Sequence, residues 1–241
     1  MLCAPNSMSL SMNKDPAISV IIPVLNEAQG INDVIAHIRS QAAVDAVEII
    51  VVDGNPAGNT IKAISHPGII TAVAEKGRGS QMNCGAIRAT GDILLFLHAD
   101  TFLPPNAFAC IRKCMEVTRH TGGAFALGID SEQKVFRITE RYVAWRTRLT
   151  RIPFGDQAIF VRRDYFERIG GYRDIPIMED VDLMRRIRQR GDAICVVPEK
   201  VMTSARRWEK DGIVLGTIRN WMLQVLYCCG VSPDRLARFY R

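Results

Sequence analysis

The chain has 241 residues, of which 48% are hydrophobic and 23% are charged, values ordinary for a soluble globular protein and contrary to a disordered or fibrous chain. The net charge of +6 is uneven: residues 1–133 carry 9 Lys and Arg against 12 Asp and Glu, whereas residues 134–241 carry 22 against 13. The basic half suits an anionic partner such as a phosphate, an acidic lipid surface or nucleic acid, and a solvated charged face is the plain alternative.

The seven cysteines include no CxxC pair and no Cys/His cluster, which argues against a disulfide framework and against a zinc site. We therefore expect small, buried, reduced cysteines. Residues 1–16 lack a cationic start followed by an apolar run, so they are predicted to form a frayed tail and not a signal peptide. These features favour a cytoplasmic protein.

The first half of the chain alternates between strand and helix patterns. Four segments are predicted as strands: residues 17–23, 47–52, 69–74 and 93–97. Helices are predicted at residues 28–41 and in the segment that runs from the glycine-rich loop at 75–85 to Thr90. This spacing is typical of right-handed parallel βαβ units, so we expect an α/β fold with a mostly parallel central sheet flanked by helices.

The second half is more mixed. Strands are predicted at residues 122–129 (at an edge or antiparallel), 158–161 and 194–197, and helices at 104–119, 134–150, 164–170, 179–189 and 212–227, with a short basic helix after Pro233. The helix at 134–150 is amphipathic and basic. Residues 213–231 are apolar but contain Arg219, Asn220 and Gln224, so we expect an interfacial or packed helix and not a spanning one.

The central stretch is residues 91–101, GDILLFLHADT, in which five uninterrupted apolar residues lead into His98-Ala99-Asp100. On extended backbone, side chains two residues apart point the same way, so His98 and Asp100 share a face. Open α/β sheets bind ligands at the carboxyl ends of their strands. We therefore expect the functional site here.

Six strings occur in order along the chain: PVLNE at 23–27, VVDG at 51–54, KGRGSQMNCG at 76–85, GDILLFLHADT at 91–101, GDQAIFVRR at 155–163 and MEDVDLMRR at 178–186. Together they resemble an inverting family 2 glycosyltransferase with the GT-A fold. The HADT variant with SARRW at 204–208 is most similar to a small bacterial transferase-2 subgroup associated with radical-SAM and selenium-domain genes. The resemblance implies a tail at 1–16, a catalytic domain at 17–208, and a helical extension at 209–241 packed on the domain or on a membrane or partner surface.

The resemblance assigns nucleotide binding to six residues: Pro23, Asn26, Glu27, Asp53, Lys76 and Arg78. Glu27 is suited to bind a ribose diol, and Asp53 is suited to bind the base. The basic loop before a helix N-terminus is suited to bind a diphosphate. The alternatives are a first-turn helix charge for Glu27, a turn residue for Asp53 and a solvated basic loop.

The resemblance also implies a divalent metal, Mn²⁺ or Mg²⁺, held by Asp100 in a DxD-type motif between carboxylate and pyrophosphate. This sequence departs from that motif because His98 stands in the place of the first aspartate. Either His98 is a metal ligand that shifts the preference toward Mn²⁺, or it hydrogen-bonds the donor, or it is a buried structural residue.

Asp180 matches the catalytic base of the family, which takes the proton of the attacking hydroxyl; a first-turn helix charge is the alternative. The resemblance places six further residues near donor or acceptor: Asp156, Gln157, Glu179, Arg206, Arg207 and Trp208. Arg206, Arg207 and Trp208 resemble the diphosphate-gripping motif of processive relatives, but they lack its leading glutamine.

The implied function is inverting, metal-assisted transfer of a sugar, of hexosyltransferase type, from a nucleotide-sugar donor to an unknown hydroxyl acceptor. One rival is a catalytically degenerate sugar-nucleotide-binding module, favoured only by His98. Another is a sugar nucleotidyltransferase, which would need a glycine-rich phosphate loop directly after the first strand. We expect no nucleic-acid partner. Peripheral contact with the inner face of the cell membrane and a homodimer are both compatible with the sequence.

Overall fold

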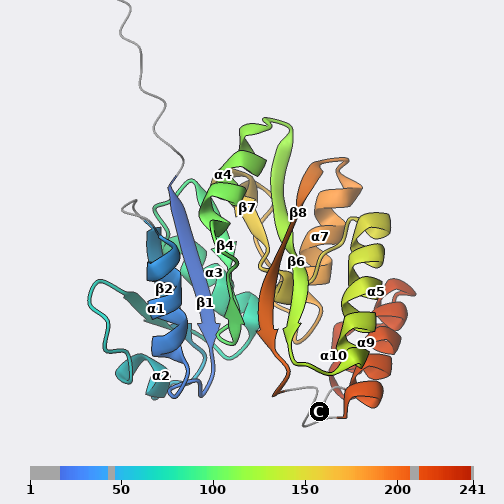
Figure 1. Ribbon diagram of the computed structural model, residues 1–241, viewed down its shortest axis with the longest axis horizontal. Coiled ribbons are helices and arrows are strands. Elements are labelled where there is room, and N and C mark those ends of the chain that lie inside the picture. Colours follow the sequence, from blue (N-terminus) through green and yellow to red (C-terminus); the bar gives the residue numbers. More distant parts are fainter. Residues whose placement is uncertain (1–16, 43–46, 207–211, 240–241) are drawn as a thin grey trace, which may run out of the picture.

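The computed structural model describes residues 17–42, 47–206 and 212–239. They form a single eight-stranded sheet with the strand order β3-β2-β1-β4-β7-β6-β8-β5 (Figure 1). The strands are β1 (Ile18–Val24), β2 (Val47–Asp53), β3 (Ile70–Val73), β4 (Ile93–Phe96), β5 (Thr101–Phe102), β6 (His120–Asp130), β7 (Phe160–Arg162) and β8 (Ala193–Ser204). Strands β3, β2, β1 and β4 are parallel, as predicted for the first half of the chain.

Helices cover both faces of this sheet (Figure 1). They are α1 (Ile31–Gln41), α2 (Asn59–Lys62), α3 (Arg78–Arg88), α4 (Ala107–Glu116), α5 (Lys134–Thr150), α6 (Arg163–Arg168), α7 (Glu179–Gln189), α9 (Ile213–Cys228) and α10 (Pro233–Ala237), with a 3-10 turn, η1, at Gly155–Gln157. None of the helices in these ranges is long and apolar enough to cross a bilayer.

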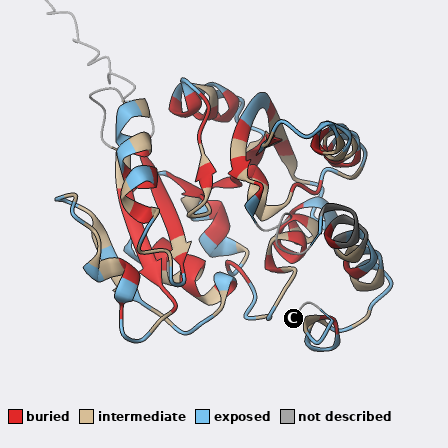
Figure 2. Ribbon diagram, turned by 60° about the horizontal axis from the view of Figure 1, so that its bottom comes forward, coloured by how far each residue is buried: buried red, intermediate tan, exposed pale blue. Residues whose placement is uncertain are grey.

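The alternation of side chains along the strands builds two cores, one on each face of the sheet. In β1, Val20 and Ile22 pack with α1 and α4, whereas Ile21 packs with α3, α6 and α7. The central strands are therefore buried throughout, while the outer faces of the surrounding helices remain exposed (Figure 2). Apolar runs such as those in β1 and β4 are explained by this burial on both sides.

The second half of the sheet follows the expectations in part. Strand β6 is antiparallel to β7, one of the two predicted alternatives, and it does not lie at an edge, because β8 pairs along its other side. Strand β8 is longer than the strand predicted at residues 194–197 and extends to Ser204, because it pairs with β6 and then with β5. Strand β5 itself was not predicted, since two residues carry no periodic signal.

Strand β5 determines where Asp100 lies. Only four residues separate β4, near the middle of the sheet order, from β5 at its end, so the sheet has to curl to bring these strands together. The backbone N–H of Ser204 donates to the carbonyl oxygen of Asp100 at 3.0 Å. The carboxyl ends of β4 and β8 thus meet at Asp100.

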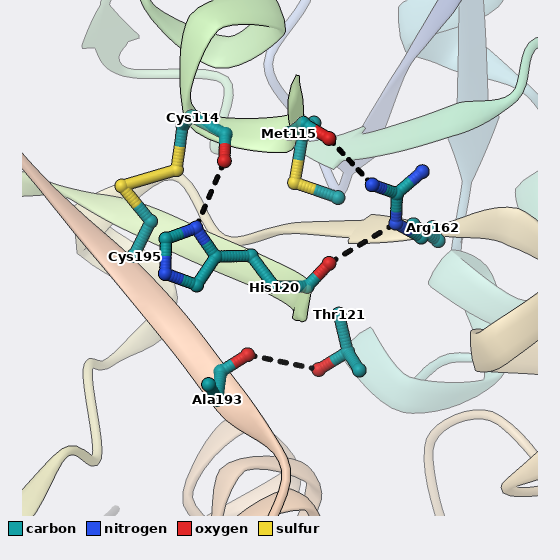
Figure 3. Close-up of a disulfide and its surroundings, with 7 residues drawn as sticks. All are labelled: Cys114, Met115, His120, Thr121, Arg162, Ala193 and Cys195. Atoms are coloured by element: carbon teal, nitrogen blue, oxygen red, sulfur yellow. Dashed lines mark hydrogen bonds between the residues drawn. A yellow bond between two sulfur atoms is a disulfide. The ribbon is translucent and has the colours of Figure 1, made fainter. Parts of the chain in front are cut away.

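A disulfide links Cys114 of α4 to Cys195 of β8 across 81 residues of sequence (Figure 3). The expectation of reduced cysteines throughout is therefore wrong for this pair. The expectation of burial is wrong for Cys228 and Cys229, which are exposed. Nδ1 of His120 donates to the carbonyl oxygen of Cys114 at 2.9 Å and packs beside the bridge. Spacing along the chain could not indicate this pair, because the sheet brings it together.

Candidate functional site

A cavity of about 570 Å³ opens at the carboxyl ends of β1 and β4. Nine residues singled out from the sequence line it: Pro23, Glu27, Lys76, Arg78, His98, Asp100, Asp156, Glu179 and Asp180. They come from the loop after β1, the start of α3, the turn after β4, the η1 turn and the start of α7. Segments far apart in the sequence therefore contribute to one site, as expected for the carboxyl edge of a parallel sheet.

The cavity combines basic and acidic groups. Lys76 and Arg78 lie at the N-terminus of α3, where the backbone N–H groups of the first turn and the helix dipole favour an anion. Five carboxylates line the same cavity: Glu27, Asp100, Asp156, Glu179 and Asp180. Such a cavity can hold the phosphates of an anionic ligand while keeping carboxylates available for proton transfer or metal binding.

Asp180, the second residue of α7, is held by backbone N–H groups on both of its oxygens. Gly155 donates to Oδ2 at 2.6 Å, and Val181 donates to Oδ1 at 2.7 Å. A carboxylate has about four acceptor positions, so Asp180 keeps capacity to accept a further proton or hydrogen bond. Its orientation is fixed before any substrate arrives.

Gly155 is a site residue that the sequence did not single out, although it begins the GDQAIFVRR string. A Cβ atom at this position would lie 2.9 Å from Nε2 of His98 and 3.3 Å from Oδ2 of Asp180. Only glycine lets the η1 backbone pass between these two side chains. A glycine directly before the Asp-Gln pair was the available signal.

Burial perturbs two of the carboxyl groups. Burial, reinforced by the charge of Asp180, raises the pKa of Glu179 to about 7. Burial also raises the pKa of Asp156 to about 6, although Arg146 opposes the shift. Oδ1 of Asp156 is buried without a hydrogen-bond partner in the protein. A buried acceptor of this kind in a cavity wall suits a hydroxyl group of a ligand.

Arg146, also missed from the sequence, lies on the buried side of α5. Its guanidinium stacks over the ring of Phe154 at 3.4 Å, and Nη2 donates weakly to Gln157 at 3.3 Å. Burial lowers the pKa of Arg146, and the charge of Asp156 counteracts that effect. The helix pattern indicated basic residues but could not show which of them faces the core.

The raised pKa of Glu179 predicts a pH-dependent stability. Below pH 4.5, the ordinary pKa of the group, Glu179 is protonated in both the folded and the unfolded state. Between pH 4.5 and about 7 it loses its proton in the unfolded state only, so the free energy of unfolding falls as the pH rises through this range. Glu179→Gln should remove this loss. Urea unfolding at pH 5.5 and 8 should show that the wild type loses roughly 1 to 2 kcal/mol more than the variant.

The exposed Glu116 on α4 offers a matched control, since Glu116→Gln should leave the wild-type pH dependence in place. An equal loss of stability in wild type and Glu179→Gln would contradict the assignment.

Four predicted residues among those described do not line the cavity: Asn26, Asp53, Gln157 and Arg206. Asp53 is fully buried, and its two oxygens accept the backbone N–H groups of Asn55 and Thr60 at 2.8 and 3.0 Å. Gln157 is also fully buried and donates to the carbonyl oxygen of Phe125 at 3.0 Å. Asn26 has a φ of 60°, a left-handed conformation that asparagine tolerates well. Ligand contacts for all four remain predictions.

Arg206 and Glu27 form an ion pair at 3.2 Å. Glu27 lines the cavity, whereas Arg206 is exposed and lies outside the lining. Two residues expected to contact different parts of a donor therefore contact each other. Arg207 and Trp208, which follow Arg206 in the predicted diphosphate-gripping motif, lie outside the described residues.

Asp100 and His98 are the candidate metal ligands. In the described part of the chain, the only cluster of three donor side chains within 4.8 Å is Cys114, His120 and Cys195, away from this cavity. A divalent ion at Asp100 would therefore complete its coordination with ligand phosphates and water, as Mg²⁺ and Mn²⁺ do in nucleotide sites. The mixed oxygen and nitrogen donors fit such an ion.

The curled, mostly parallel sheet with a mixed-charge cavity at its carboxyl edge defines a GT-A glycosyltransferase fold. The chain belongs to glycosyl transferase family 2, whose model matches residues 19–170. Two curated relatives agree. The chain is 26% identical over 225 residues to the uncharacterized glycosyltransferase Rv1514c of Mycobacterium tuberculosis, covering 87% of this chain and 84% of that one. It is 25% identical to the probable glycosyltransferase YdaM of Bacillus subtilis, covering 83% of this chain and 52% of YdaM.

Solved structures show the same fold. The mannosyltransferase PcManGT from Pyrobaculum calidifontis, in complex with GDP-Man and Mn²⁺, superposes with a TM-score of 0.60 at 23% identity, covering 79% of this chain and 57% of that one. S. aureus TarS in complex with UDP-GlcNAc also gives 0.60, at 14% identity, covering 78% of this chain and 58% of TarS. This chain thus spans a little more than half the length of both.

Proposed function

We propose that this family member transfers a sugar, with inversion at the anomeric carbon, from a nucleoside-diphosphate sugar to a hydroxyl acceptor. The observation that carries the proposal is the 570 Å³ cavity, in which a basic helix N-terminus and five carboxylates line the same space. We also propose that the protein belongs to the transferase-2 subgroup associated with radical-SAM genes. Membership of that subgroup does not identify the acceptor.

The donor would lie with its nucleoside near Pro23 and Glu27 and its diphosphate at Lys76 and Arg78. Two solved neighbours with this fold are in complex with GDP-Man and UDP-GlcNAc, which supports a nucleotide-sugar donor without selecting a base. Glu27 keeps acceptor positions beside its contact with Arg206, so it could accept from a ribose hydroxyl without leaving that arginine.

A divalent ion held by Asp100, with His98 as a second donor, would neutralise charge that develops on the leaving diphosphate. The protein's own groups perform the remaining steps. Lys76 and Arg78 orient the diphosphate. The unpartnered oxygen of Asp156 accepts a hydrogen bond from a hydroxyl group of the sugar or of the acceptor.

Asp180 would act as the base. The acceptor oxygen attacks the anomeric carbon opposite the departing diphosphate, so a bond from that oxygen to the carbon forms as the bond to the diphosphate oxygen breaks. The acceptor proton passes to Asp180, whose orientation Gly155 and Val181 fix.

Donor binding and turnover test the proposal. UDP-, GDP- and dTDP-sugars should be titrated with Mn²⁺, Mg²⁺ or EDTA, and diphosphate release should be followed in wild type and Asp100→Ala. We expect one nucleotide sugar to bind in the presence of metal, and the wild type to release its nucleoside diphosphate slowly. Asp100→Ala should lose the metal-dependent binding.

One specific observation favours a second candidate: His98 replaces a family carboxylate. A degenerate sugar-nucleotide-binding module would bind a nucleotide equally well in EDTA and release no diphosphate under any condition. That result would replace the transferase proposal.

A further inference from the structure

The outer face of α5 has an unusual composition. Between Lys134 and Leu149 every exposed side chain is cationic or apolar: Lys134, Arg137, Ile138, Arg141, Trp145, Arg148 and Leu149. The acidic residue of this helix, Glu140, is buried and pairs with Lys200 at 2.8 Å. A helix face turned only toward water normally carries mixed charges and few large apolar groups.

The apolar residues of α5 form a stripe on the side away from the core. At about 100° per residue, Ile138, Trp145 and Leu149 lie within about 40° of one another, and the buried Phe136 and Val143 lie roughly opposite. The three exposed side chains are 67%, 61% and 66% accessible. The helix therefore has two apolar faces, one packed in the core and one whose side chains Ile138, Trp145 and Leu149 are largely exposed.

Helix α9 extends this face. Trp221 of α9 stacks on Tyr142 of α5 with ring centroids 4.1 Å apart, so the two helices lie side by side (Figure 1). Met222 and Val225 are 49% and 61% exposed, whereas Leu223 is buried. The exposed side chains of α5 from Lys134 to Leu149, together with Trp221, Met222 and Val225, are called the α5/α9 face below.

Helix α9 lies between the α5/α9 face and the proposed donor site, because it contributes Gly216 and Arg219 to the cavity lining from the side roughly opposite Trp221 and Val225. We propose that this face binds the interface of an anionic lipid bilayer and presents the cavity to an acceptor at that membrane. The second part of this inference rests on the proposed function; the first does not.

Charge complementarity favours a lipid surface over a second copy of this chain. Two copies joined through this face would bring the cations of one copy, among them Arg141 and Arg148, close to those of the other, because every charged side chain exposed between Lys134 and Leu149 is a cation. Phosphate headgroups would neutralise these side chains, while Trp145 and Trp221 would lie at the level of the headgroups, where tryptophan is favoured. The exposed acidic residues Asp130 and Glu132 precede α5 in the chain. They lie at the end of the helix opposite Leu149 and so do not interrupt its cationic and apolar face.

Vesicle flotation without nucleotide tests the proposal, using phosphatidylcholine vesicles with and without phosphatidylglycerol at low salt. The wild type should float with the anionic vesicles alone. Arg141→Gln with Arg148→Gln should weaken partitioning about 30-fold. Trp145→Glu with Leu149→Glu should abolish it. Ile87→Glu is the matched control, because Ile87 is an 83% exposed apolar residue on α3; it should float like wild type.

Three outcomes would overturn the proposal: no flotation of wild type with anionic vesicles, equal flotation of all variants, or a dimer in sedimentation velocity that Trp145→Glu with Leu149→Glu dissociates while vesicles do not bind. Donor affinity in lipid-free solution is a separate readout and should be the same in wild type and in both double variants. Failure of donor binding in all of them would contradict the proposed function and leave the flotation result standing.

Discussion

Asp180→Asn is expected to lower the rate of sugar transfer about 10²–10⁴-fold while donor affinity stays within about twofold of wild type. The amide keeps the size of the side chain but cannot take the proton of the acceptor hydroxyl. It also replaces one oxygen by a donor group, which would face the N–H of either Gly155 or Val181. Transfer rate and donor affinity should therefore be measured separately, with unfolding by urea as a check on stability.

The control must separate catalysis from a simple helix effect. Asp33 lies in the first turn of α1, is exposed and does not line the cavity, so Asp33→Asn removes a comparable first-turn charge outside the site. Its transfer rate should match wild type. If Asp180→Asn costs only a few-fold in rate, the base is another carboxylate of the cavity, and Asp156 would be the next candidate.

Gly155→Ala is expected to reduce transfer about 100-fold, the loss that a displacement of about 1 Å in a catalytic group can cause. The added methyl would approach His98 Nε2 at 2.9 Å and Asp180 Oδ2 at 3.3 Å, so at least the histidine has to move. The measurement is kcat under donor saturation, together with donor affinity. The chain offers a control in Gly30→Ala, where a Cβ meets nothing within 4 Å and φ is −102°.

An unchanged kcat in Gly155→Ala would show that His98 can move aside without disturbing Asp180. The proposed role of Gly155 would then be wrong, although the role of Asp180 would stand.

The sequence predicted the parallel half of the sheet and the place of His98 and Asp100 in the cavity lining for one physical reason. Long apolar runs such as that of β4 indicate strands buried on both faces, and polar residues that follow such strands must meet at one edge. His98 and Asp100 follow this rule. The same reasoning could not tell which polar side chains are already hydrogen-bonded to other groups of the protein and so do not face a ligand. Asp53 follows β2 in the same way, yet it is buried and bound to two backbone N–H groups.

The features missed from the sequence depend on contacts between distant segments. The guanidinium of Arg146 stacks on Phe154 and lies near Asp156, but the sequence shows only one arginine among several in a basic helix. Strand β5 has two residues and exists because β8, about a hundred residues later, pairs with it. Neither feature has a local signal.

The pairing of β5 with β8 has a consequence for how the site assembles during synthesis. The family model ends at residue 170, but the carbonyl oxygen of Asp100 accepts from Ser204, and Asp180 also lies beyond that point. A nascent chain that has left the ribosome only as far as residue 170 can form the parallel strands, yet it holds Asp100 in an unpaired turn. Completion of the cavity must therefore wait until β8 has emerged, and a fragment cut at the end of the family match would contain five of the six strings without a finished site.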